Sequence, residues 1–600
     1  MVDKSPDARS DDRAHTPAHY DRRSFLRRGV RAGGALIGSA AALDALTAQA
    51  SALGVPRVAA PSAAGPPPNI LVIVVDQMRY PRWFGGAGPR VTFPPNLERL
   101  RRGGISFARH HTASNDCTPA RSTLLTGLHT HQTGCMITGV STLAPAFETW
   151  GSYLRERGYA TYWYGKWHLT RGDRHWNEID GPPALERYGF DGGTYPSPNG
   201  APAQGWHADP KIAQQFVDWY AQAGGDSPWC TTVSFVNPHD IAWWYRWSDV
   251  SPAEASAPAL IHQLPANFET PKQLRSKPLL QRSLQNTTDL SFGDVSYAGR
   301  ELLPSWTPFL DLYVKLQLAA DRQIGIVLDT LASRPDVAAN TVVIFTADHG
   351  EYGASHGLRG KGAGLYEEGI NVPLIVNDLR RSATAYPEVT RTQLSSSVDI
   401  VPLLLTLASG SDGWRDEARY SHLATRLDLA PILLDPTAPG RDYALHATDE
   451  VVTEFALEPY SAIAPIHVVG LIIKKAKYGI YSHWRRGTTE MDPGGQENEL
   501  YDYSTLAGRL EIDNRAGASR LEDGLRAALE GAVTEELRAP LPPRLLDAQR
   551  DGFEDYFKSE QRATEVSLAR RRRELQQIVA SELGGAPSGG RRRPARARRS

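Results

Sequence analysis

Four short segments that predict strands, each followed within two residues by polar side chains, set the pattern of this chain. They are residues 69–75, 160–164, 231–236 and 341–346, and β-branched and aromatic residues are frequent in them. The first segment is a continuous apolar run, which is typical of a strand buried on both faces of a parallel sheet. The stretches between them leave room for helices, such as residues 149–158. We therefore predict an α/β fold with a large, mixed and mostly parallel sheet flanked by helices.

The last third of the chain has a different pattern. Residues 471–481 predict two strands around a turn, and residues 520–537 predict a helix packed on them. This indicates a smaller C-terminal α+β domain with an antiparallel sheet. A chain of 600 residues is also longer than one hydrophobic core normally organises.

The N-terminus has the features of a targeting signal. Arg22 and Arg23 precede a weakly apolar run, residues 29–46, and then a small-x-small site at Ala48–Ala50. This pattern is typical of a twin-arginine export signal and predicts a periplasmic or extracellular protein that engages the twin-arginine machinery. Asp44 interrupts the short run, so no stable membrane span is expected. A basic disordered leader is the alternative.

The predicted organisation has five parts. In order, they are the export signal 1–50, a linker 51–68, a large domain 69–454 with an insertion 241–306, the smaller domain 455–560, and a charged helix with a basic disordered tail 561–600. The insertion is rich in Pro, Ser and Gln and is expected to consist mainly of loops.

Charge and cysteine content argue against a nucleic-acid-binding protein and against a disulfide-stabilised scaffold. There are 66 basic and 67 acidic residues, a net charge of −1, so no overall field favours nucleic acid. The three cysteines, Cys117, Cys135 and Cys230, do not make a disulfide framework. Whether Cys135 and Cys230 pair, and whether the protein forms oligomers, stays open.

Polar residues follow each predicted strand. Asp76-Gln77 follow the first, Lys166 and His168 the second, His239 the third, and Asp348-His349 the fourth. Ligands of open α/β sheets bind beyond the carboxyl ends of the strands. The carboxylate and the amide that follow the first strand are therefore candidate metal ligands.

A separate motif, residues 115–127, adds a reactive group. It contains Cys117-x-Pro119-x-Arg121 and predicts the start of a helix that ends at Gly127. Arg121 lies one turn after Cys117, so both can face one pocket. A helix N-terminus beside a guanidinium attracts a tetrahedral anion. A small buried cysteine that opens a helix is the alternative.

This motif resembles the signature of the formylglycine-dependent (type I) sulfatases of the alkaline phosphatase superfamily. In that family the cysteine is oxidised by a formylglycine-generating enzyme, and the hydrated aldehyde attacks the sulfate ester. The resemblance extends in order through Gly165-Lys166-Trp167-His168, His239, Asp348-His349 and Lys361, and to Glu499-Leu500-Tyr501-Asp502 in the smaller domain.

The resemblance implies a sulfuric ester hydrolase and a role for each matched residue. Cys117 would become the nucleophile, Lys166 and Lys361 would hold sulfate, His168 would act as base, and His239 would protonate the leaving group. Arg121 would neutralise the anion. The implied metal ligands are Asp76, Gln77, Cys117, Asp348 and His349.

Two positions depart from the common family pattern. Gln77 and His349 stand where many sulfatases have an aspartate and an asparagine, which resembles the branch of choline sulfatases and phosphonate monoester hydrolases. The family implies calcium, which prefers oxygen ligands, whereas an imidazole shifts the preference toward manganese or zinc. The sequence leaves the metal open, and also the choice between sulfate and phosphonate or phosphate esters.

The aromatic run 241–247 follows His239 and bears on the substrate, expected to be a small-molecule sulfate ester. It could wall the pocket, as a stacking surface or a cage for quaternary ammonium, and packing of the insertion is the favoured alternative. An exported metal-binding protein without activity is a further alternative for the whole chain, which the presence of every catalytic-type position disfavours.

Overall fold

A computed structural model describes residues 66–583 except 87, 92, 171–181, 195–196, 227, 245–260, 382–388, 454–457 and 486–487. The predicted export signal, all of the linker before Pro66 and the tail after Leu583 lie outside these residues. Within the described part, no helix is long and apolar enough to cross a membrane.

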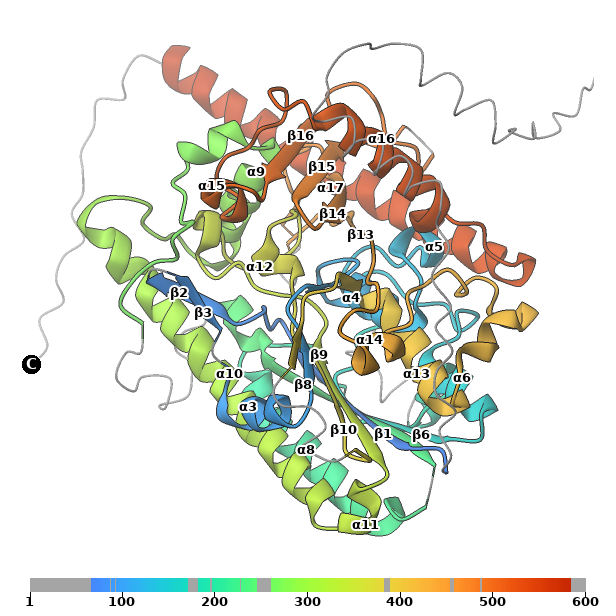
Figure 1. Cartoon of the computed structure of the whole chain (residues 1–600). Coiled ribbons are helices and arrows are strands. Elements are labelled where there is room, and N and C mark those ends of the chain that lie inside the picture. Colours follow the sequence, from blue (N-terminus) through green and yellow to red (C-terminus); the bar gives the residue numbers. More distant parts are fainter. Residues whose placement is uncertain are drawn as a thin grey trace, which may run out of the picture. The chain divides into compact units, whose positions relative to one another are not determined.

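The large sheet has eight strands in the described residues, in the order β11-β4-β10-β9-β1-β8-β6-β7 (Figure 1). Strands β9, β1, β8, β6 and β7 run parallel, whereas β10 is antiparallel to both β9 and β4. The bounds are β1 Asn69–Asp76, β4 Ile105–Phe107, β6 Ala160–Gly165, β7 Asp191–Gly192, β8 Trp229–Pro238, β9 Thr341–Ala347, β10 Leu374–Asp378 and β11 Val389–Arg391. The predicted α/β fold with a mixed, mostly parallel sheet is confirmed.

Both faces of β1 are buried, which explains its uninterrupted apolar sequence. Ile70, Val72 and Val74 belong to one core cluster, and the alternate residues Leu71, Ile73 and Val75 belong to another. Helices α4 (Cys117–Thr126), α6 (Trp150–Glu156) and α13 (Ile400–Ser409) contribute to the first cluster, and α3 (Pro95–Arg102), α8 (Gln204–Ala223) and α10 (Leu302–Ala332) to the second. Figure 1 shows these two helical layers on opposite sides of the strands.

The C-terminal sheet is antiparallel and has the order β13-β14-β15-β16, with bounds Tyr443–Thr448, His467–Ile473, Ala476–Ser482 and Glu497–Asp502. One face packs on α16 (Glu522–Ala532) through Leu525 and Leu529. The other packs against Leu365 and Tyr366, which follow the loop containing Lys361. The boundary at 454/455 stays a prediction, and it divides this sheet between the paired strands β13 and β14.

The remaining elements are short or peripheral. They are β2 Arg82–Gly86, β3 Gly88–Val91, β5 His110–His111, β12 Ser395–Ser396, α5 Thr130–Thr133, α9 Leu279–Phe292, α11 Pro335–Ala338, α12 Glu367–Ile370, α14 Ala430–Leu434, α15 Leu506–Arg509 and the long α17 Pro543–Leu583. The helix predicted for residues 562–583 is the C-terminal half of α17.

The predicted loop character of the insertion is wrong for part of it. Residues 279–292 form helix α9, and α10 begins at Leu302. The Ser, Thr and Gln side chains that indicated a loop are mostly buried there, since they bond to neighbouring segments. Gln281 donates to Ala363 O (3.2 Å) and Tyr481 OH (2.9 Å), and Gln285 donates to Gly357 O (2.9 Å). The polar residues in this part of the insertion therefore belong to a helix and bond to neighbouring segments; they do not indicate a loop.

At Gly165, the last residue of β6, the backbone lies very close to the backbone of the neighbouring strand β8. Its φ is +103°, and a Cβ there would lie 1.9 Å from Ser234 O on β8. We expect Gly165→Ala to lower the free energy of unfolding by about 3 kcal/mol or more, because backbone must shift beside Lys166.

Gly158→Ala is the matched control. Gly158 also has a positive φ, +83°, but no described atom lies within 4 Å of its Cβ position, so only backbone strain of about 1–2 kcal/mol is expected. Urea unfolding of both variants measures the difference, and equal losses would contradict the close-approach argument.

Candidate active site

Cys117 is the first residue of α4 and is fully buried. The preceding Asp116 has φ +74°, and the helix ends at the left-handed Gly127, as the sequence predicts. Two cations approach the sulfur: Lys361 Nζ at 3.1 Å and Lys166 Nζ at 3.6 Å. His349 Nε2 lies at 3.3 Å and Asp76 Oδ1 at 3.5 Å. This cysteine therefore faces a polar site, not an apolar core.

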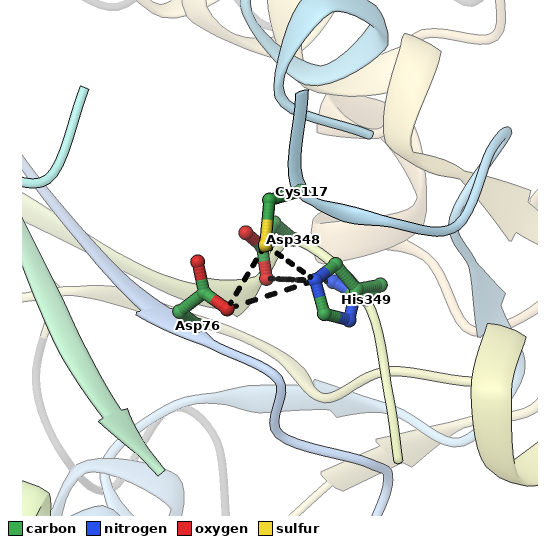
Figure 2. A group of neighbouring side chains, drawn as sticks. All are labelled: Asp76, Cys117, Asp348 and His349. Carbon is green, nitrogen blue, oxygen red and sulfur yellow. Dashed lines mark hydrogen bonds and ion pairs between the residues drawn. The ribbon is translucent and has the colours of Figure 1, made fainter. Parts of the chain in front are cut away.

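Four side chains from three segments converge on one point (Figure 2). Asp76 ends β1, Asp348 and His349 follow β9, and Cys117 begins α4. One ligand atom from each lies within 4.8 Å of all the others. The predicted metal-ligand residues Asp76, Cys117, Asp348 and His349 are thus brought together.

The donor atoms of this group are oriented by their neighbours. His349 Nδ1 lies 2.9 Å from Gly350 O, which directs Nε2 toward Asp76 Oδ1 and Asp348 Oδ1, each 3.6 Å away. A ring nitrogen held by a backbone carbonyl in this way leaves the other as a ligand. Asp76 Oδ2 forms ion pairs with Arg121 and Lys166, whereas Asp76 Oδ1 faces the other three side chains of the group. The donor set fits a divalent cation.

Gln77, the fifth predicted ligand, is held by a residue that the sequence analysis missed. Glu351 Oε2 accepts from Gln77 Nε2 at 2.6 Å, and Glu351 Oε1 accepts from Gly353 N (3.0 Å) and Gly360 N (2.7 Å). This leaves Gln77 Oε1 facing Lys361 Nζ at 2.9 Å. Glu351 stands two residues after His349, which is the signal that could have found it.

Arg121 connects the ends of four strands. It bonds Asp76 Oδ2 at 2.9 Å, lies 2.9 Å from Asp348 Oδ2, and donates to Lys166 O (2.7 Å) and Ser234 Oγ (3.1 Å). These groups belong to the ends of β1, β9 and β6 and to β8. The guanidinium is 1% exposed. Arg121 therefore fixes α4, and with it Cys117, to the carboxyl edge of the sheet.

Burial and charge act in opposite directions on the two aspartates. Burial alone would raise the pKa of Asp76, but Lys166, His239 and Arg121 together hold it well below its usual value. Burial and the neighbouring Asp76 raise the pKa of Asp348 to about 7, against the opposing effect of Arg121. The negative charge of Asp348 is thus less fully compensated by neighbouring cations than that of Asp76. A further positive charge beside Asp348 would stabilise its carboxylate form.

The two predicted acid–base histidines, His168 and His239, are both buried. His239 begins directly after β8, next to Asp76 through the pairing of Asp76 with Pro238. His168 has φ +56°, and its carbonyl accepts from Thr118 Oγ1 at 3.0 Å, which ties the loop after β6 to the first turn of α4. Their proton-transfer roles stay predictions.

A small cleft lies beside Lys361 and Gln77. Its walls include Ile241, Ala242 and Trp244 from the aromatic run, with Phe292 from α9 and Phe309 from α10. Trp243 instead packs on Phe292, with ring centroids 5.9 Å apart. Part of the run therefore walls the cleft and part packs, and residues 245–247 lie outside the described residues. All three cysteines are free thiols, so Cys135 and Cys230 do not pair.

Comparison with known proteins agrees with this geometry. The sequence model of the Sulfatase family matches residues 68–411. The chain is 28% identical to "Uncharacterized sulfatase YidJ" of Escherichia coli (strain K12) over 57% of this chain and 68% of that protein. It is 23% identical to the choline-sulfatase of Rhizobium meliloti (strain 1021), over 75% and 82% of the two chains.

Solved structures share the fold. A phosphonate monoester hydrolase from Silicibacter pomeroyi superposes with a TM-score of 0.59 at 19% identity, covering 79% of this chain and 96% of that one. Fold, site and sequence match define a sulfuric ester hydrolase. The chain belongs to the sulfatase family, in agreement with the resemblance of its motifs.

The bonds of Glu351 lead to a prediction. In Glu351→Gln, an amide N–H₂ must face either Gln77 Nε2 or the two backbone N–H groups, so at least one buried donor loses its acceptor. We expect a loss of about 1–3 kcal/mol in unfolding free energy and weaker binding of divalent cations, measured by thermal shift and calorimetric titration. The exposed pair Arg485–Glu490 supplies the control Glu490→Gln, and equal cation affinity in both variants would refute this role.

Proposed function

We propose that the protein hydrolyses sulfate esters with a formylglycine made from Cys117 and a divalent cation held by Asp76, Gln77, Asp348 and His349. The observation that supports this most is the environment of Cys117 Sγ. Two lysines, an imidazole and a carboxylate approach the sulfur within 3.6 Å. Such surroundings suit a bound tetrahedral anion and do not suit a cysteine that serves only packing.

Three cations would neutralise the sulfate. Lys166 and Lys361 approach the position of the nucleophile from two different loops. The third cation, Arg121, lies 2.9 Å from Oδ2 of both Asp76 and Asp348 and would add positive charge to the same buried site. Fixed positive groups in a buried site stabilise charge that shifts onto the oxygens in the transition state.

Proton transfers are assigned to the two histidines. His239 follows Pro238, which pairs with Asp76, and stands two residues before the cleft-lining Ile241; it would donate to the leaving oxygen. His168 would take a proton from the nucleophile's second hydroxyl and so promote release of sulfate. A divalent cation, when bound, supplies Lewis-acid polarisation.

Hydrolysis of phosphonate or phosphate esters is the second candidate. Two observations support this alternative. Gln77 and His349 are among the proposed metal ligands, and the fold is shared with a phosphonate monoester hydrolase. The same three cations would suit phosphoryl oxygens. Export by the twin-arginine route, with maturation of Cys117 before export, completes the proposal and rests on the sequence of residues 21–50.

Substitution of Cys117 tests the nucleophile. After co-production with the formylglycine-generating enzyme, we expect peptide mass spectrometry to find an aldehyde in place of the Cys117 thiol. Cys117→Ala should reduce turnover of an aryl sulfate by at least about 10³-fold, because no covalent intermediate can form. Cys230→Ala, at another buried free thiol, should keep most of the activity of the folded protein. An unmodified thiol in a fully active protein would refute the assignment.

Parallel assays separate the two ester classes. The modified protein should hydrolyse aryl sulfates with a higher kcat/KM than aryl phosphonate monoesters bearing the same phenol. Matching the phenol keeps the leaving group constant, so the ratio reports recognition of the anion alone. Turnover of the phosphorus esters only would replace the sulfatase proposal by its alternative.

A further inference from the structure

Arg359 stands in the cleft wall two residues before Lys361, and no role was assigned to it from the sequence. Its side chain is 3% exposed. One amino group of the guanidinium is fully used: Nη2 donates to Asp289 Oδ1 at 2.6 Å and to Gly293 O at 2.7 Å. Tyr297 OH also donates to Asp289, at 2.9 and 3.1 Å to its two oxygens. Asp289 and Gly293 therefore fix the guanidinium in place.

The other amino group has no acceptor among the residues that the structure describes. Nη1 of Arg359 is buried and makes no hydrogen bond within the described part of the chain. A buried guanidinium donor without an acceptor destabilises the folded protein, because its hydrogen bonds to water are lost and no hydrogen bond within the protein replaces them. Arg359, Lys361 and Trp244 line the same cleft, so a ligand in the cleft is positioned to supply the missing acceptor.

The cleft also indicates which part of the ester meets Arg359. Lys361 is at the sulfur of Cys117, where sulfate would be held. Ile241, Ala242 and Trp244 follow His239, the proposed donor to the leaving oxygen. The cleft beyond Lys361 therefore receives the leaving alcohol. The Arg359 guanidinium lies 5.8 Å from the Trp244 ring centroid, so a cation already lies beside this ring, which disfavours a cage for quaternary ammonium there.

We propose that Arg359 is a specificity-determining residue that binds an anionic group on the leaving alcohol, either a carboxylate or a second sulfonate-type oxyanion. This rests on the proposed function and names the substrate class of the same site: sulfate esters of acidic phenols or acidic sugars. The guanidinium would use Nη1 for the anion and keep Nη2 on Asp289. The apolar walls formed by Phe292 and Phe309 would pack against the ring of the alcohol.

Three aryl sulfates test the proposal: the sulfate esters of 4-hydroxybenzoate, 4-hydroxybenzenesulfonate and 4-hydroxybenzamide, with the 3-hydroxy isomers run alongside. Intrinsic reactivity of each phenol cancels when the ratio of acidic to neutral ester is compared between variants. We expect Arg359→Gln to lower this kcat/KM ratio roughly tenfold, because a charge-assisted bond is lost, chiefly through KM. The benzoate and sulfonate arms show which oxyanion is preferred.

Controls keep a folding defect separate from a loss of recognition. Because Arg359→Gln removes the cationic partner of Asp289, the double variant Asp289→Asn/Arg359→Gln removes the buried pair together, and it should show the same reduced ratio. Arg359→Lys should retain part of the preference. Arg334→Gln, at a guanidinium over Tyr220 (5.5 Å) outside this cleft, should leave the ratio unchanged.

The outcomes distinguish this proposal from the proposed function. If the neutral ester is hydrolysed but the ratio is the same in wild type and Arg359→Gln, the assignment of Arg359 is wrong and the sulfatase mechanism stands. If no sulfate ester is hydrolysed, the mechanism is wrong, and calorimetric binding of 4-hydroxybenzoate against 4-hydroxybenzamide still decides on Arg359. Equal binding of the two phenols by wild type would overturn the inference.

Discussion

The site depends on a single buried guanidinium. Arg121 reaches the carboxylates that end β1 and follow β9, the carbonyl of Lys166 after β6, and the hydroxyl of Ser234 on β8. Four strands that lie apart in sequence thus present polar groups to this one residue of helix α4. Removing one partner from a buried ion cluster leaves uncompensated charge, so the cluster holds its geometry against local change.

This arrangement also explains why a reactive residue can be buried. The interior around Cys117 is polar but saturated with paired charges: Lys166 bonds Asp76, Lys361 bonds Gln77, and Gln77 bonds Glu351. Each of the two lysines near the sulfur has an anionic or amide partner within the protein. An incoming oxyanion therefore enters a site whose charges are fixed beforehand, and little reorganisation is needed during reaction.

The sequence predicted most of the sheet because a short apolar, β-branched run such as residues 69–75 is typical of a strand buried on both faces. It predicted Cys117, Asp76 and Asp348 because strand ends and helix starts have strong local signals. It did not predict helix α9, whose buried Gln281 and Gln285 satisfy partners more than 70 residues away. It also did not predict Glu351 or Arg359, since their importance comes from bonds to Gln77 and Asp289 that no local pattern encodes.

The most direct test of the central claim is a diffraction structure of the protein matured by the formylglycine-generating enzyme and soaked with a divalent cation. The account predicts that residue 117 has an oxygen in place of sulfur, and that this oxygen, Asp76, Gln77, Asp348 and His349 surround one cation, with Arg121 still bridging the two aspartates. A cation bound elsewhere, or an intact thiol turned away from Asp76 and Asp348, would contradict it.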